Sequence, residues 1–167
     1  MEARDATVFK VALRLRRKMS SHRGWSYPKW SLLHLVPDES GSIAPARQRT
    51  VRHDDGTEDH FWCGFPVSLT RANAETYWFN LCSVRPSLFV VCRQDLDGEL
   101  VPVSVTLDQD ASSRQAEAEG EVFAVPLPEP MVEWLERFVV THFRPEPRRR
   151  RRKPLDKEDR RTGRSRI

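Results

Sequence analysis

The side chains that could do chemistry are scattered along this sequence of 167 residues. His53 and His60 flank a group of four carboxylates, and together these side chains could attract a divalent cation. The carboxylates are Asp54, Asp55, Glu58 and Asp59. We favour a solvated loop for this stretch, because its spacing matches no metal-binding motif.

The three cysteines, Cys63, Cys82 and Cys92, form no CxxC pair and have no motif-spaced histidines. We expect them to be reduced, buried and small hydrophobic residues rather than zinc ligands. A nucleophile pair of Cys82 with a histidine would need the fold to bring the two together. The sequence also lacks a P-loop, a dinucleotide-binding glycine motif and a nucleophile elbow. We therefore expect no metal, no cofactor and no recognisable active site.

The elements that would position these side chains predict an α+β fold. Apolar and polar residues largely alternate over residues 8–16, with Val11, Leu13 and Leu15 on one face. This pattern is typical of an antiparallel strand with one face exposed to solvent. We expect one mainly antiparallel sheet of five to six strands with two main helices packed on it. The predicted strands span residues 8–16, 30–37, 60–69, 87–93, 100–107 and 121–127. Residues 20–29 are expected to form a polar loop and residues 38–58 a long hairpin connection.

Apolar spacing predicts helices over residues 71–83 and 131–143, and a short polar helix over residues 112–119. Trp78 and Trp134 fall on the apolar stripes of the two long helices, so we expect both to pack in the core. His142 lies on the second of these stripes and His34 in a strand, where structural roles are expected. The apolar run at 87–93 indicates a central strand covered on both faces.

Charge divides the chain into residues 1–147, expected to be a single domain, and residues 148–167, expected to be a disordered tail. The tail holds eleven Lys and Arg against three acidic residues, a charge of +8, whereas the whole chain carries +4 and residues 1–147 therefore −4. Such a segment has too little apolar content to fold alone. No apolar run approaches the roughly 20 residues that cross a bilayer. The first five residues lack a secretory pattern, so we expect a cytoplasmic protein.

Trp25 is the most informative aromatic residue, because it lies among charged residues in the predicted loop. We expect an exposed aromatic surface around Trp25 and Trp30 to bind a partner, since large rigid rings gain contact area at low entropic cost. The alternative is that Trp25 folds back as a lid on the sheet. The basic run after Pro147 is the second expected contact. It consists of Arg148, Arg149, Arg150, Arg151, Arg152 and Lys153.

This basic run has three interpretations: binding of nucleic-acid phosphates, docking on an acidic protein or anionic membrane surface, or simple solvation. A protein partner or solvation is favoured, because the tail has no aromatic residues and the preceding 147 residues are acidic.

The block from residue 75 to 93, ETYWFNLCSVRPSLFVVCR, resembles the central signature of a family of uncharacterised bacterial proteins. The opening strand with Trp25 and Trp30, the PVSVT stretch at 102–106 and the segment from 125 to 147 agree with it, so the resemblance covers nearly all of residues 7–153. Members of that family are encoded beside genes for molybdenum-dependent formate dehydrogenase and its maturation factors. Some carry the label molybdopterin-guanine dinucleotide biosynthesis protein A. That label denotes a nucleotidyltransferase, which is expected to have a doubly wound α/β fold with a glycine-rich nucleotide loop near its N-terminus. This sequence has no such glycines near its N-terminus.

The resemblance implies a context, formate dehydrogenase assembly or regulation. The segregated charge and the loop residue Trp25 favour, within that context, a non-catalytic accessory or assembly protein that acts by protein binding in maturation or regulation. Its expected partner is a formate dehydrogenase subunit or a maturation factor. The alternative is a nucleic-acid-binding or regulatory protein that uses the basic C-terminal tail.

Overall fold

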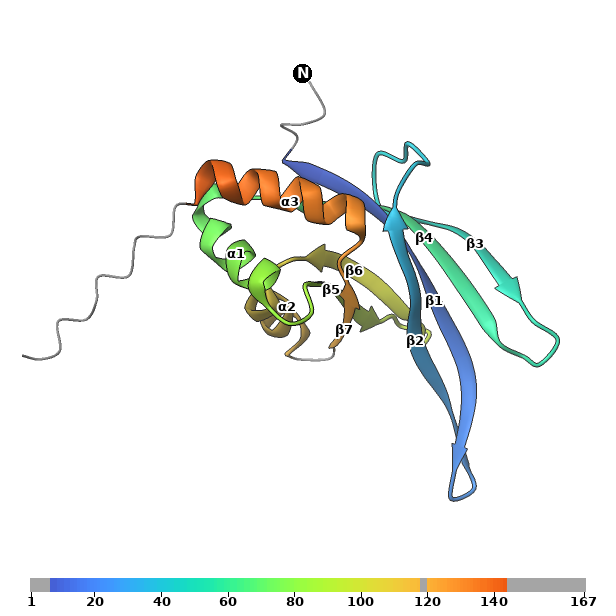
Figure 1. The fold of residues 1–167 in the computed structure, drawn as a ribbon. Coiled ribbons are helices and arrows are strands. Elements are labelled where there is room, and N and C mark those ends of the chain that lie inside the picture. The colour runs from blue at the N-terminus through green and yellow to red at the C-terminus, as the bar shows by residue number, and fades with distance from the viewer. Residues whose placement is uncertain (1–6, 118–119, 144–167) are drawn as a thin grey trace, which may run out of the picture.

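Two antiparallel sheets and three helices make up the described part of the chain in the computed structural model (Figure 1). The described residues are 7–117 and 120–143. The expected tail and its basic run, Arg148 to Lys153, lie outside them. The expected α+β class is confirmed, but the expectation of a single sheet is wrong, because the strands divide into a four-stranded and a three-stranded sheet.

The four-stranded sheet has the order β2-β1-β4-β3 and is antiparallel throughout. Its strands are β1 (Val8–His22), β2 (Trp25–Pro37), β3 (Ala46–Arg52) and β4 (Glu58–Ser68). The expected alternation in β1 is confirmed, since Val11, Leu13 and Leu15 are all buried. Residues between them point to the other face of the sheet.

The polar loop expected from residue 20 is instead the end of a long hairpin. β1 and β2 remain paired as far as His22 and Trp25, and only Arg23 and Gly24 form the turn. Both turn residues have positive φ angles, 50° and 80°, which fits the tight turns whose twist matches two paired strands. Hairpin pairing, rather than irregular chain, therefore places Trp25.

The long connection expected at 38–58 contains strand β3. Its side chains are exposed at every position except the half-buried Val51, so it lacks the alternation that reveals a strand. Backbone pairing with β4 holds it at the edge of the sheet. Gly64 lies in a bulged part of β4, where its φ of 80° and the close approach of the Ala44 carbonyl leave no room for a side chain.

The three-stranded sheet has the order β6-β5-β7, with β5 (Ser87–Gln94) between β6 (Leu100–Thr106) and β7 (Gly120–Pro126). Val90 and Val91 are adjacent in β5 and both are fully buried. Neighbouring residues of a strand point to opposite faces. The expectation of a strand covered on both faces is therefore confirmed.

The helices are α1 (Ala74–Cys82), preceded by a 3-10 turn (Arg71–Asn73), α2 (Gln109–Ala116) and α3 (Glu129–His142). Met131, Leu135 and Val139 of α3 are buried in one core cluster that includes residues of both sheets and of α1. Trp134 packs its ring 5.2 Å from that of Phe9. The expected core role of Trp134 is confirmed. No helix in the described ranges is long and apolar enough to cross a membrane.

Candidate functional site

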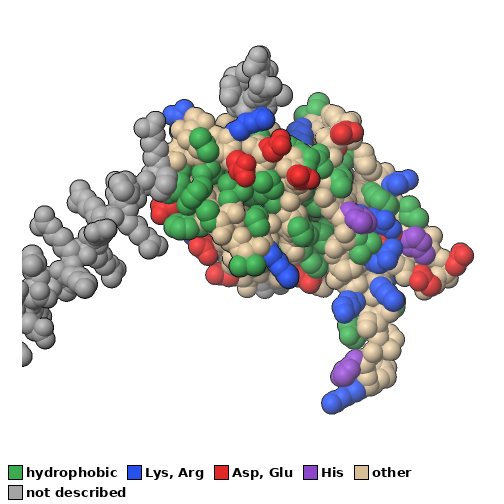
Figure 2. All heavy atoms as spheres, in the orientation of Figure 1, with side chains coloured by type: hydrophobic (Ala, Val, Ile, Leu, Met, Phe, Trp, Pro, Cys, Tyr) green, Lys and Arg blue, Asp and Glu red, His purple; other side chains and the backbone are tan. Residues whose placement is uncertain are grey.

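Positive charge concentrates in the β1–β2 hairpin. Residues 8–37 contain seven Lys and Arg and no Asp or Glu. Lys, Arg and His side chains follow this hairpin in Figure 2, and no acidic side chain is visible on its projecting end. The charge of residues 1–147 is therefore unevenly distributed, and a whole-domain value of −4 conceals a basic region.

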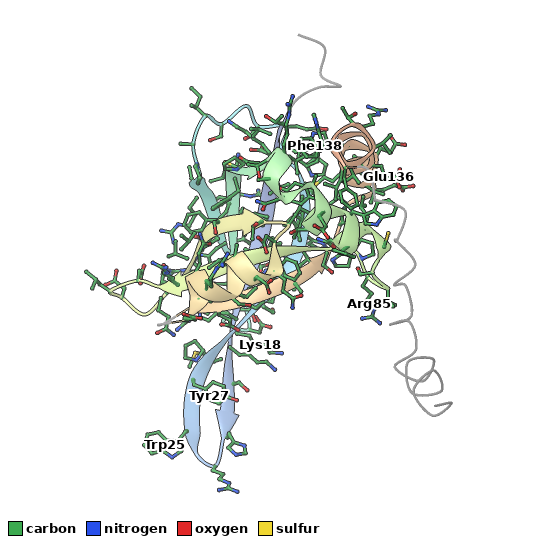
Figure 3. The ribbon with its side chains drawn as sticks, turned by 90° about the vertical axis from the view of Figure 1, so that its left-hand side faces the viewer. Lys18, Trp25, Tyr27, Arg85, Glu136 and Phe138 are labelled. Carbon is green, nitrogen blue, oxygen red and sulfur yellow. The ribbon has the colours of Figure 1, made fainter. Side chains whose placement is uncertain are left out.

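The projecting end of the hairpin, residues 18–29, is called the arm below. It begins where β4 stops pairing with β1, at the Arg17–Glu58 pair, so only two strands continue. Every side chain of the arm is exposed except the half-buried Ser20. Trp25 is 79% exposed and Tyr27 is 43% exposed. Figure 3 shows both rings and Lys18 on this projection.

Strand register decides which arm residues share a face. Lys18 lies opposite Lys29, Ser20 opposite Tyr27 and His22 opposite Trp25. Residues opposite one another in an antiparallel pair point to the same side, and so do residues two apart in one strand. These side chains therefore form one surface, here called the arm face. It consists of Lys18, Ser20, His22, Trp25, Tyr27 and Lys29.

A buried carboxylate lies at the base of the arm, on the same side of the sheet. The Asp59 side chain is fully buried and accepts hydrogen bonds from Arg16 Nε at 2.8 Å, from Arg16 Nη2 at 3.1 Å and from Arg14. His53 Nε2 lies 2.7 Å from Asp59 Oδ2. The Arg16 hydrogen bonds are the largest cause that holds the pKa of Asp59 well below its usual range, against the opposing effect of burial. Asp59 thus fixes both arginines rather than leaving them for a ligand.

Phe61 continues this side of the sheet next to Asp59. The Arg49 guanidinium lies 4.4 Å from the Phe61 ring centre, and that of Arg14 lies 5.2 Å from it. Both distances are within the range of cation–π attraction. The base of the arm is therefore a rigid, internally paired region that holds the first strand of the arm in place.

Trp30 corrects one prediction about the site. It is 8% exposed, and its ring centre lies 5.4 Å from that of His60 on the opposite side of the sheet from the arm face. The cause is the alternation of β2, which turns Trp25 and Tyr27 outward and Trp30 inward. Trp30 therefore supports the hairpin from the core and lies outside the exposed aromatic surface. Trp25, by contrast, is exposed and does not fold back on the sheet.

Sequence reasoning missed Lys18, Tyr27 and Lys29. The available signal was the absence of acidic residues from 8 to 37. Their alignment depends on the register that the Arg23–Gly24 turn sets, which alternation alone does not specify.

The acidic stretch expected to be a solvated loop is only partly so. Asp54 and Asp55 are exposed, whereas Asp59 and His60 are buried in β4. His53 contacts Asp59 on one side of the sheet, and His60 Nδ1 lies 3.3 Å from Arg47 on the other. Within the described ranges, no group of three His, Cys, Asp or Glu side chains could hold a metal ion.

The cysteines are all free, and Cys63 and Cys92 are buried as expected. Burial raises the pKa of the Cys92 thiol to about 12. Cys82 is exposed at the end of α1, so the expectation that all three are buried is wrong for this residue. Across residues 7–117 and 120–143, no histidine side chain hydrogen-bonds the side chain of a serine, threonine or cysteine.

An open groove of about 820 Å³ runs along α3. Glu136 and Phe138, labelled in Figure 3, lie on it with Arg71, Trp134 and His142. Its charges are of both signs and it is widely open to solvent. This groove lies at the helical end of the molecule, away from the arm (Figures 1 and 3).

Comparison with known families adds one match. A family described as "protein of unknown function (DUF3305)" matches residues 10–152. The chain belongs to this family. The match covers both sheets and all three helices, so the arm, Asp59 and Trp25 lie inside the family's domain. No curated protein and no solved structure matches the chain.

Proposed function

We propose that this DUF3305 protein is a non-catalytic accessory or assembly protein that binds a partner protein through its arm. The observation that supports this most is Trp25, a large ring that is 79% exposed near the tip of a projecting hairpin. Burying a large aromatic residue contributes strongly to stability, and exposing one forgoes that contribution. Exposed Trp and Tyr are also the residues most enriched among the dominant contacts of protein interfaces.

The cellular process that we propose is the maturation or regulation of a molybdenum-dependent formate dehydrogenase in the cytoplasm. This part rests on the resemblance of residues 75–93 to proteins encoded beside formate dehydrogenase genes. The partner would be a formate dehydrogenase subunit or one of its maturation factors. Trp30 would act indirectly, by packing on His60 and holding β2 in place at the base of the arm.

Interface area gives a condition on this proposal. A stable interface buries about 800 Å² on each partner, which corresponds to roughly 20–30 residues. The arm has twelve residues, so it would supply the centre of a small contact and needs a second contact surface. We propose the basic run from Arg148 to Lys153 as that second surface.

Affinity purification from the native host grown on formate tests the proposal. The bait is the full chain, compared with Trp25→Ala and with Phe79→Ala, which removes an aromatic side chain that is 63% exposed on α1. We expect a formate dehydrogenase component to co-purify with the wild type and with Phe79→Ala but not with Trp25→Ala. Co-purification of no such component with the wild-type chain would overturn the proposal.

The tail has a separate test in the same host. Deletion of residues 148–167 should reduce recovery of the partner, because the deletion removes a charge of +8. Unchanged recovery would remove the tail from the contact and leave the arm as its proposed site.

A further inference from the structure

We propose that the arm face binds an acidic segment of a protein partner, whose carboxylates contact Lys18 and Lys29 while its apolar side chains pack on Trp25 and Tyr27. This inference rests on the proposed function, because it specifies the chemistry of the partner at the same arm. It adds residues and a charge type that the sequence patterns alone did not assign.

The lysine pair is the observation that carries the inference. Lys18 and Lys29 lie directly opposite each other, where Cβ atoms are about 4.5–5.5 Å apart. Like charges in this position destabilise a hairpin. In the described part of the chain, neither lysine makes an ion pair or a hydrogen bond. Asp55 attracts Lys18 electrostatically without forming an ion pair with it, and no described acidic side chain pairs with Lys29. An external carboxylate between the two ammonium groups would offset the repulsion more fully.

The aromatic residues extend the same face toward the tip. Trp25, Tyr27 and Lys29 are spaced two apart in β2, which sets successive side chains about 7 Å apart. The run from Trp25 to Lys29 therefore spans roughly 14 Å, the length of about four extended or nine helical residues. The arm face thus fits a short segment that combines carboxylates with one or two apolar side chains.

The small number of unpaired basic side chains in the arm favours a protein partner over nucleic acid. Five arginines of the four-stranded sheet already form ion pairs with Asp59, Glu58 or Glu99. They are Arg14, Arg16, Arg17, Arg47 and Arg52. The arm itself keeps three Lys or Arg side chains, whereas nucleic-acid sites commonly neutralise about 6–10 phosphates. A short acidic segment needs only the few cations that the arm supplies.

The β2 edge of the arm is poorly suited to binding an added strand, which favours the side-chain face as the contact surface. β2 is an edge strand, and edge strands can bind an added strand through their backbone. Pro28 has no N–H group, and prolines in edge strands turn that missing donor toward solvent. Pro28 therefore interrupts, near the base of the arm, the row of donors that a strand added to β2 would need.

The first test is binding of a defined probe to the full chain. The probe is a fluorescein-labelled 12-residue peptide of Glu and Asp with two leucines, measured by fluorescence anisotropy at low salt. The test variant is Lys18→Gln/Lys29→Gln. Its control is Arg71→Gln/Arg85→Gln, which removes two exposed charges at the other end of the molecule, where Figure 3 labels Arg85.

We expect the lysine variant to bind the peptide about fivefold to thirtyfold more weakly, as the loss of two exposed ion pairs implies. The control variant should bind within about twofold of the wild type. Thermal unfolding should show the lysine variant to be at least as stable as the wild type, because its repulsion has been removed. Equal peptide binding by the lysine variant and the wild type, or no binding by the wild type, would overturn the inference.

A single-stranded oligonucleotide of equal charge is the competing probe. Tighter binding of this oligonucleotide than of the peptide, lost in the lysine variant, would overturn the inference in favour of nucleic acid.

The outcomes separate this inference from the proposed function. A formate dehydrogenase component that is lost with Trp25→Ala but retained with Lys18→Gln/Lys29→Gln would overturn the acidic contact alone. Lysine-dependent peptide binding without any such component would support the arm face and overturn the proposed function alone.

Discussion

Replacing the buried carboxylate at the base of the arm should produce the largest stability loss among single polar substitutions in the four-stranded sheet. Asp59→Asn keeps the size of the side chain but removes the charge that Arg14, Arg16 and His53 contact. Removing one partner of a buried ion pair costs about 3–5 kcal/mol. The Arg14 and Arg16 side chains are 25% and 34% exposed, so both regain some hydration after the substitution.

The expected loss is therefore about 2–4 kcal/mol in the free energy of unfolding, below the full cost of breaking a buried pair. For a domain of this size, that corresponds to a decrease of about 5–15 °C in Tm. Urea unfolding at pH 7 measures it. Asp54→Asn, an exposed carboxylate in the adjacent turn, is the matched control and should lie within about 0.5 kcal/mol of the wild type.

The pH dependence gives the same prediction an independent check. Folding lowers the pKa of Asp59, chiefly through the Arg16 hydrogen bonds, from an ordinary value of 3.8. A carboxyl group with a lowered folded-state pKa contributes its full stability above the unfolded value and loses it as the pH falls toward the folded value. The difference in the free energy of unfolding between the wild type and Asp59→Asn, here called the gap, should thus be constant from pH 5 to pH 7 and smaller at pH 3. A gap below about 1 kcal/mol at pH 7, or one as large at pH 3 as at pH 7, would refute the reasoning.

Three further substitutions or measurements test the fold around the site. Gly64→Ala should destabilise the protein by about 2 kcal/mol more than Gly98→Ala in urea unfolding, because both glycines have a φ of 80° but only Gly64 faces the Ala44 carbonyl at close range. Equal losses would contradict this difference. An NMR titration should place the pKa of His60 below 6.5, since burial is the main cause that lowers it, and stability should fall as the pH drops below 6.5. A His60 pKa at or above 6.5 would count against its burial. Asn80→Ala should cost about 2 kcal/mol in thermal unfolding, because the Asn80 side chain hydrogen-bonds the backbone of Ser87 twice and the Leu107 carbonyl once. A loss below about 0.5 kcal/mol would show that water replaces these bonds.

The elements that could be predicted from the sequence are those that bury one regular set of side chains. Val11, Leu13 and Leu15 reveal β1, and the unbroken apolar run of β5 reveals a strand covered on both faces. The apolar stripe of α3 predicts its position to within two residues at its start and one at its end. In each case, burial imposes a period that the residue types record directly.

The elements that could not be predicted are held by backbone pairing alone. β3 presents almost only exposed side chains, so its composition resembles that of a loop. Residues 18–29 likewise have no buried side chain, and only the turn at Arg23 and Gly24 sets their pairing. The division into two sheets depends on which strands exchange hydrogen bonds, which composition does not record.

The candidate site was predictable in part for the same reasons. The exposure of Trp25 follows from its charged surroundings, but the burial of Trp30 requires knowing that β2 begins at Trp25. The burial of Asp59 requires knowing that β1 places Arg16 across from it and Arg14 two residues away on the same face. The Lys18–Lys29 pair requires the register itself.

Both faces of the arm are exposed to solvent, so the arm can lose its structure without unfolding of the core. The ladder of residues 18–29 can open without exposing any buried apolar side chain, whereas opening β1 at Val11 or Leu13 exposes the core. Amide protons of the arm should accordingly exchange with solvent through local fraying, and those of the β1 core through global unfolding. A bound partner would slow exchange at the arm by opposing its local opening, and it would also slow exchange of the core protons, because global unfolding releases the partner. The hairpin can therefore open locally without unfolding of the core, and its amide exchange reports occupancy even where the overall structure does not move.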